Sequence, residues 1–208
     1  MTPEVQGQVK VWDIVVRTFH WLLVALFVLC YISGDFVDLL HAYLGYGILL
    51  LLGVRVVWGL MGTKYARFAG FIYGWKRVKE YSAGLMAGRP PYYLGHNPLG
   101  GWMIILLLVG LFLACWSGLE AYADQGHGPL AYEDARLLNV AYADDEKQED
   151  NEGELWEEVH EVLANFVLLL VIVHIAGVLI ASLLHKENLV RSMWTGYKVD
   201  KRDGSGPA

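Results

Sequence analysis

Apolar positions in this 208-residue chain form long continuous blocks, without the short alternation of strands or the one-sided pattern of soluble helices. Four blocks reach the roughly 20 residues that a helix needs to cross the hydrocarbon of a bilayer. Backbone groups in lipid must find their partners within the segment, so each block is expected to be helical. The pattern predicts an all-α membrane protein, a four-transmembrane-helix bundle with spans at residues 14–33, 39–61, 99–118 and 159–184.

Charged residues are scarce and are segregated between the loops. They make up 18% of the chain. Residues 62–98 and the tail 185–208 are rich in Lys and Arg, whereas residues 119–158 hold thirteen acids against two bases. The positive-inside rule therefore predicts that both termini are cytoplasmic and that the acidic loop lies on the outer side. This topology is that of a multi-pass membrane protein.

The remaining composition narrows the chemistry. Cys30 and Cys115 both lie inside apolar blocks and belong to no CxxC unit, which excludes covalent haem c attachment, a zinc knuckle and an iron–sulfur set. No basic patch suited to nucleic acid is present. The first block is long enough to stay in the membrane, so no cleaved signal peptide is expected. Residues 1–208 are expected to form a single membrane domain.

Four of the seven histidines fall within the spans or at their mouths: His20, His41, His160 and His174. An ionisable side chain inside a membrane is costly and indicates a functional site. His160 and His174 are fourteen residues apart on one predicted helix. That spacing offsets them by about 40° and separates them by about 21 Å along the axis. One helix thus presents two imidazoles on one side, near opposite leaflets.

Depth sorts the four histidines into two pairs. His41 and His160 lie near the outer ends of the second and fourth spans. His20 lies about 21 Å below the outer end of the first span, at the level of His174. Each level therefore offers two imidazoles from different helices, as a six-coordinate haem requires on its axis.

Two arginines lie at the inner level. Arg17 precedes His20 by three residues on the same helix face, and Arg55 follows His41 by fourteen. Haem propionates would suit them because a guanidinium binds carboxylates bidentately. Two alternatives remain open: helix–helix hydrogen bonds by single histidines, and a proton or ion path. Another metal such as zinc would require its ligands to be clustered in one place instead of in two distant pairs. The other histidines, His96, His127 and His185, are expected to be structural.

Short motifs extend over nearly the whole chain. They are Val11-Trp12-Asp13, Arg17-x-x-His20-Trp21, His41-x-x-x-Gly45, Arg55-x-x-Trp58, Gly95-His96-Asn97-Pro98-Leu99-Gly100, and His160 followed after thirteen residues by His174. With them the chain resembles the bacterial cytochrome b561 family, which is similar to the b-type cytochrome subunit of nickel–iron hydrogenases. The spacing of the last two histidines is the most specific of these motifs.

The resemblance implies a four-helix bundle that holds two haem b groups by bis-histidine ligation. It assigns the iron ligands to His20, His41, His160 and His174. Such proteins exchange electrons with membrane quinone on one side and with a redox partner on the other. The long acidic loop suggests a basic periplasmic cytochrome c as that partner, by charge attraction; a solvated loop without a partner is the alternative.

The predicted function is therefore that of a dihaem b-type cytochrome that transfers electrons between the quinone pool and a periplasmic redox partner. One alternative is a superoxide oxidase that passes electrons to quinone, although the acidic outer mouth would repel the superoxide anion. Another is a haem-free membrane transporter or anchor, which would show no haem absorption after purification.

Overall fold

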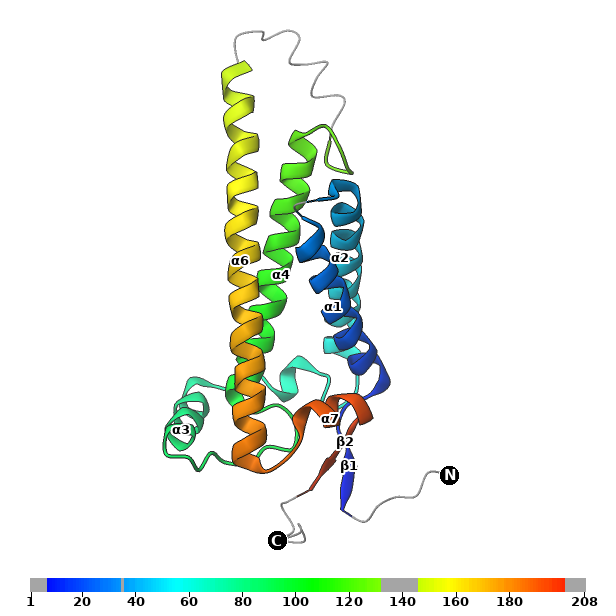
Figure 1. The fold of residues 1–208 in the computed structure, drawn as a ribbon. Coiled ribbons are helices and arrows are strands. Elements are labelled where there is room, and N and C mark those ends of the chain that lie inside the picture. The colour runs from blue at the N-terminus through cyan, green and yellow to red at the C-terminus, as the bar shows by residue number, and fades with distance from the viewer. Residues whose placement is uncertain (1–6, 35, 132–145, 201–208) are drawn as a thin grey trace. The chain divides into compact units, whose positions relative to one another are not determined.

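The structure is a computed structural model and describes residues 7–34, 36–131 and 146–200, with side chains in the last range from Glu154 onward. In this part of the chain, four helices are long and apolar enough to cross a membrane, which confirms the predicted fold class. They are α1 (Ile14–Ser33), α2 (Asp38–Met61), α4 (Pro98–Asp124) and α6 (Glu146–His185) (Figure 1). The protein is thus an all-α, multi-pass membrane protein.

Side-chain caps fix where two of these helices begin. Asp13 Oδ1 accepts a hydrogen bond from the backbone N–H of Val16, 3.0 Å away, at the start of α1. Asn97 Oδ1 accepts one from Gly100 N at 2.7 Å, and Pro98 occupies the first position of α4. A proline is tolerated there because its missing N–H would have no partner within the helix.

The acidic segment 119–158 is largely helical where the structure describes it. Its first residues continue α4 to Asp124, and its last residues belong to α6, which begins at Glu146. The apolar portion of α6 is Glu154–His185. Residues 132–145 of the expected loop lie outside the described residues.

The basic segment between α2 and α4 contains a short turn and a helix. Residues Phe68–Gly70 form the 3-10 turn η1, and Trp75–Met86 form α3. Val78 and Tyr81 are the buried residues of α3, whereas its basic side chains are exposed. This two-sided pattern is typical of a helix lying at a membrane surface.

The chain divides into two compact units. The first, called the bundle unit here, comprises Leu23–Leu52 and Leu107–Leu170. Within it, each helix segment contacts its neighbours through small or polar residues. The contacts are Leu26 with Gly47, Gly45 with Cys115, Gly110 with Val167, and Tyr31 with Asn165. They join α1 to α2, α2 to α4, α4 to α6 and α6 back to α1. Small residues let membrane helices approach closely.

The second unit, called the terminal unit here, comprises Met1–Leu22, Gly53–Leu106 and Val171–Ala208. It contains the short strands β1 (Gln8–Lys10) and β2 (Tyr197–Val199), which pair antiparallel (Figure 1). Its core is a cluster of buried apolar side chains: Val11, Trp12, Val16, Ala66 and Leu94. The segments before α1 and after α7 (Leu189–Thr195) are therefore tied to each other and to the same core.

Candidate functional site

His41 and His160 lie opposite each other in the bundle unit. His41 comes from the first turn of α2 and His160 from α6. Their ring centroids are 5.8 Å apart and the ring planes make an angle of 86°. A metal–imidazole nitrogen bond is about 2 Å long, so one metal atom between two rings at this separation could contact both. The structure thus brings together the first of the two predicted pairs.

Both rings are held by their Nδ1 atoms. His41 Nδ1 lies 2.9 Å from the backbone oxygen of Cys30, and His160 Nδ1 lies 2.9 Å from that of Ala114. A carbonyl oxygen can only accept, so each Nδ1 must carry the proton and donate it. The lone pair of each ring is therefore on Nε2. This is the tautomer and second-shell arrangement commonly found for histidines that bind metals.

Each carbonyl that holds a histidine also accepts a serine hydroxyl. Ser33 Oγ donates to the Cys30 oxygen at 3.0 Å, and Ser117 Oγ donates to the Ala114 oxygen at 2.9 Å. In both cases the serine follows the carbonyl residue by three positions. The serine in α1 and the serine in α4 thus fix the geometry of the acceptor that orients the ring.

A glycine follows each of these serines, and each glycine leaves space for an imidazole. A Cβ at Gly118 would lie 2.9 Å from His160 Cε1, closer than van der Waals contact allows. A Cβ at Gly34 would lie 3.4 Å from His41 Nδ1. The two Ser-Gly pairs were not singled out in the sequence. Their repetition at the ends of two apolar blocks is the signal that could have found them.

His20 and His174 lie in the terminal unit, on α1 and α6. His174 lies close enough to interact electrostatically with His20, and also with His96. Their surroundings differ from those of the first pair. His20 Nδ1 is buried and meets no hydrogen-bond acceptor among the described residues. A buried polar atom without a partner is costly and indicates a missing group.

Arg55 reaches the interior of the same unit. Its guanidinium is buried, lies 4.8 Å from the ring centroid of Phe68 and donates from Nη2 to the backbone oxygen of Ala66 at 3.1 Å. Its Nη1 is buried without an acceptor in the part of the chain that the structure describes. Arg55 therefore retains one N–H edge suited to a carboxylate from outside the chain.

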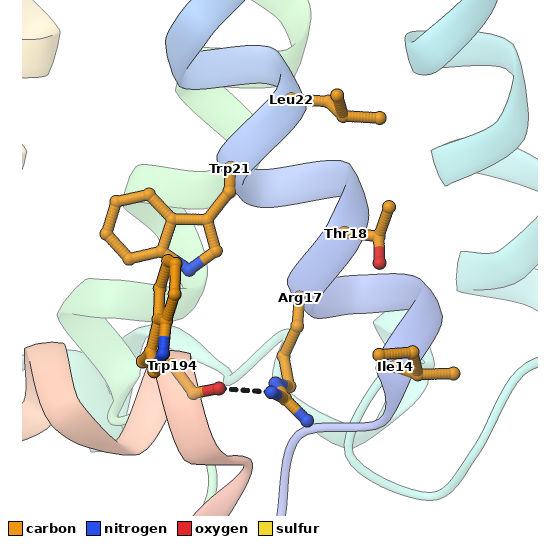
Figure 2. A pocket seen from close by; sticks show the side chains of 6 residues that line it. All are labelled: Ile14, Arg17, Thr18, Trp21, Leu22 and Trp194. Atoms are coloured by element: carbon orange, nitrogen blue, oxygen red, sulfur yellow. Dashed lines mark hydrogen bonds between the residues drawn. The ribbon is translucent and has the colours of Figure 1, made fainter.

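Arg17 is held at the end of α7. Its Nη2 donates to the backbone oxygen of Trp194 (Figure 2). A cation is stabilised there because the last carbonyls of a helix carry partial negative charge. Gly196 follows with φ of +91°, a conformation that favours glycine, and a Cβ there would press against Arg17. Arg17 Nε meets no acceptor in residues 7–34, 36–131 and 146–200.

In the described ranges, no group of three or more His, Cys, Asp or Glu side chains converges on one point. A sequence profile of the prokaryotic cytochrome b561 family matches residues 11–196. The chain belongs to the prokaryotic cytochrome b561 family. No curated protein and no solved structure matches it.

Membership in the cytochrome b561 family indicates the general function of this chain. These proteins are membrane b-type cytochromes, which bind haem b and transfer electrons. The matched range extends from Val11, before α1, to Gly196, after α7. It therefore includes both histidine pairs and both arginines.

Asp13 is a site residue of the cytochrome b561 chain whose role the sequence did not predict. Its carboxylate accepts hydrogen bonds from Thr63 Oγ1 at 2.6 Å and from Trp58 Nε1 at 3.1 Å, besides that from Val16. Burial alone would raise the pKa of Asp13, but these hydrogen bonds outweigh it and lower the pKa below its usual value. The ionised Asp13 thus joins the start of α1 to the end of α2, beside Arg55.

His96 is enclosed by aromatic rings. Its ring centroid lies 4.5 Å from that of Trp12 and 4.6 Å from that of Phe71. Burial, followed by the positive charges of Arg55 and Lys198, lowers the pKa of His96 to about 3. His96 is therefore neutral at physiological pH. The two other expected structural histidines contact tyrosine rings: His127 stacks on Tyr122, and His185 packs edge-on against Tyr92.

Proposed function

We propose that this cytochrome b561 protein is a dihaem cytochrome that passes electrons between membrane quinone and a redox partner on the outer side of the bacterial inner membrane. The observation that carries the proposal is the geometry of His41 and His160. Two facing imidazoles from different helices, each with its Nδ1 proton held by a carbonyl, supply two Nε2 lone pairs for one iron. His20 and His174 are proposed as the ligands of the second haem.

The space around these histidines supports a flat cofactor. Gly45 follows His41 by four residues on the same face of α2, and a Cβ there would meet nothing within 4 Å. Gly177 follows His174 by three residues on α6 and has the same open surroundings. One proposed ligand on each of these two helices, His41 on α2 and His174 on α6, thus has a neighbouring turn without a side chain, against which a porphyrin edge could lie.

The unpaired donors of the terminal unit support a cofactor that carries carboxylates. Arg55 Nη1 is the best placed of them, because its remaining N–H groups are engaged by the Ala66 oxygen and by aromatic rings. We propose that Arg55 binds a propionate of the haem between His20 and His174. Arg17, the second predicted propionate partner, lines a lateral pocket in the same unit, and its Nε has no acceptor among the described residues.

The protein's contribution to electron transfer lies in how it holds these groups. Haem iron, when bound by two histidines, gains and loses one electron without a change of ligands. Ser33 and Ser117 fix the acceptors that orient His41 and His160, and the apolar helices exclude water. The hydrogen bonds that the Nδ1 protons donate to these carbonyls would raise the basicity of the rings and so would favour the oxidised form of a bound haem iron.

An acidic stripe on α6 supports a basic protein partner. Glu154, Glu157, Glu158 and Glu161 are all exposed and share one helix face by their spacing of three and four residues. We propose that this stripe attracts a basic periplasmic cytochrome c. Glu154→Gln and Glu161→Gln should each slow electron exchange with such a cytochrome at low salt. The exposed Glu80 on α3 offers the control substitution Glu80→Gln.

The proposed function is tested by haem analysis of the detergent-purified chain. A dithionite-reduced minus oxidised spectrum identifies b-type haem, and pyridine haemochrome gives the ratio of haem to protein. About two haem b per chain would support the proposal. A ratio of one would contradict the second site, and the absence of haem would require the membrane histidines to be reinterpreted as a proton or ion path.

A further inference from the structure

A pocket of about 340 Å³ lies on the side of α1 in the terminal unit. Ile14, Thr18 and Leu22 form one wall along α1, and Arg17 and Trp21 form a second ridge on the same helix (Figure 2). Trp194 from α7 closes it beside Trp21, with ring centroids 5.5 Å apart. The volume is within the range of small-molecule sites in proteins, about 300 to 1,000 Å³.

Two hydrogen-bond donors on the lining lack acceptors. They are Nε of Arg17 and Nε1 of Trp21, both buried and without a partner in the described portion of the chain. Figure 2 shows the Trp21 nitrogen on the side of the ring that faces Arg17 and Trp194. Because buried N–H groups without acceptors are costly, this pocket is suited to a ligand that supplies acceptor oxygens.

The rim of the pocket is apolar and exposed. Trp194 is 65% exposed and Ile14 is 63% exposed, and Leu22 lies beside the same opening. On a membrane-spanning helix such a surface faces lipid. Among the six lining residues Arg17 carries the only charge, and its cation is already partly compensated by the Trp194 carbonyl. A phosphate group would bring negative charge to a lining whose one cation is already partly compensated, whereas a neutral ring with carbonyl oxygens and an apolar tail would bring none.

The pocket adjoins a proposed haem ligand. The ring of Trp21, which lines the pocket, lies edge-on to the ring of His20 with centroids 5.0 Å apart. A ring bound against Trp21 would therefore be separated from the His20 imidazole by one indole. This short separation would allow electrons to pass between the bound ring and a haem held by His20.

We propose that this pocket binds the head group of a quinone or quinol that arrives from the lipid. This inference rests on the proposed function, because it names the site where the quinone exchanges electrons with the haem at His20. Arg17 Nε–H and Trp21 Nε1–H donate to the carbonyl oxygens of the ring, the indole of Trp194 stacks on its face, and the apolar tail leaves past Ile14 and Leu22. In this arrangement Arg17 donates a hydrogen bond to the quinone, and Arg55 binds the haem propionate.

The test measures quinone binding by the haem-loaded protein in detergent, with ubiquinone-1 as the probe and titration calorimetry as the readout. Trp21→Phe keeps the ring and removes the donor, and Trp194→Leu removes the stacking wall. Loss of one hydrogen bond should raise the dissociation constant about threefold to tenfold in Trp21→Phe, and Trp194→Leu should weaken binding by a similar factor. Trp116→Phe, on the exposed side of α4, is the matched control and should leave the dissociation constant of ubiquinone-1 unchanged.

Two measurements on the same samples separate this inference from the proposed function. The first is the haem content of each variant, which must stay at the wild-type ratio of haem to protein. If Trp21→Phe loses haem because Trp21 lies beside His20, the conclusion rests on Trp194→Leu. Separately, ubiquinol-1 is mixed with the oxidised wild-type protein and the appearance of reduced haem is followed.

Each outcome decides the inference. Weaker binding in the pocket variants and unchanged binding in the control would support it. Equal binding in all variants would overturn the pocket, and reduction of haem by ubiquinol-1 would then leave the proposed function standing. Absence of quinone binding in the haem-loaded wild type would overturn the pocket, and absence of haem reduction would also contradict quinone as the electron donor. If an anionic phospholipid displaced ubiquinone-1 and quinone homologues did not, the pocket would be a phosphate site and the quinone inference would be overturned.

Discussion

The two histidine pairs are held in opposite ways. In the bundle unit, His41 and His160 each donate a hydrogen bond from Nδ1 to a backbone carbonyl of a neighbouring helix. In the terminal unit, His20 Nδ1 and Arg55 Nη1 are both buried without an acceptor in the described residues. The first pair is therefore completed by the chain itself except for the metal. The second is surrounded by donors that require groups from outside the chain.

This difference leads us to expect different behaviour at the two pairs. A ligand pair whose tautomer is fixed by the backbone is preorganised and binds one metal atom with little rearrangement. A pair surrounded by unpaired donors, an arginine and a lateral pocket can respond to what binds beside it. We therefore expect substitutions at the two pairs to have separate effects.

The largest effect is expected from substitution of the proposed haem ligands. His160→Ala should remove the haem of the bundle unit and His174→Ala that of the terminal unit, so each variant should retain about one haem of the two. Pyridine haemochrome quantitation measures the ratio, and low-temperature spectra tell which haem remains. Loss of both haems in either variant would contradict the independence of the two sites.

The next effect is expected at Gly118. In Gly118→Ala the new methyl group would lie 2.9 Å from the His160 ring, which must then move away from the Ala114 carbonyl. Overpacking of this kind costs about 1 to 3 kcal/mol, so the haem of the bundle unit should be lost about tenfold faster. Transfer of haem to apomyoglobin measures the rate.

Gly53→Ala is the matched control for that substitution. Gly53 lies on α2, and a Cβ there would meet nothing within 4 Å. Alanine also favours the helix over glycine. If Gly53→Ala and Gly118→Ala lost haem at the same rate, close packing against His160 would not be the cause.

A smaller effect is expected at Arg55. Arg55→Lys keeps the positive charge but removes the bidentate edge, and Arg55→Gln also removes the charge. Both should lower haem retention in the terminal unit several-fold and leave the bundle unit unaffected. Arg67→Gln, an exposed arginine in the same segment, serves as control. Equal loss at both haems would show that Arg55 acts on the stability of the whole fold instead.

The smallest expected effect is a pH dependence of stability at His96. The pKa of His96 is lowered from 6.5 to about 3, so the unfolded state takes up a proton first as the pH falls. The contribution of neutral His96 to stability is complete above about pH 6.5 and is lost progressively as the pH falls towards about 3. Asp13, whose pKa is also lowered, acts in the same direction.

His96→Phe isolates this contribution, because it keeps an aromatic ring between Trp12 and Phe71 but removes the titration. The Tm of the variant should fall less steeply than that of the wild type between about pH 6.5 and 5. The exposed His127 provides the control His127→Phe, whose profile should follow the wild type. Parallel profiles for His96→Phe and the wild type would contradict the assignment.

The spans and the approach of His41 to His160 were predictable because they depend on local and periodic properties. The continuous apolar blocks predicted the ends of α1 and α2 to within one residue. The reason is that an isolated segment in lipid can pair all its backbone N–H and C=O groups only by forming a helix. The helical rise converted positions along the chain into depths, which paired His41 with His160 and His20 with His174. The cap at Asn97 was predictable for the same local reason.

What the sequence alone determined, then, is which segments are long and apolar enough to cross the membrane, and from these spans follows the prediction of which histidines share a level. The tertiary structure decided which atoms those histidines use and what surrounds them. The Ser-Gly pairs beside His41 and His160, the strands that join the two ends of the terminal unit, and the position of Arg17 on the lateral pocket all depend on contacts between segments far apart in the chain. Such contacts depend on side-chain packing between helices, which the apolar pattern of any one helix leaves unspecified.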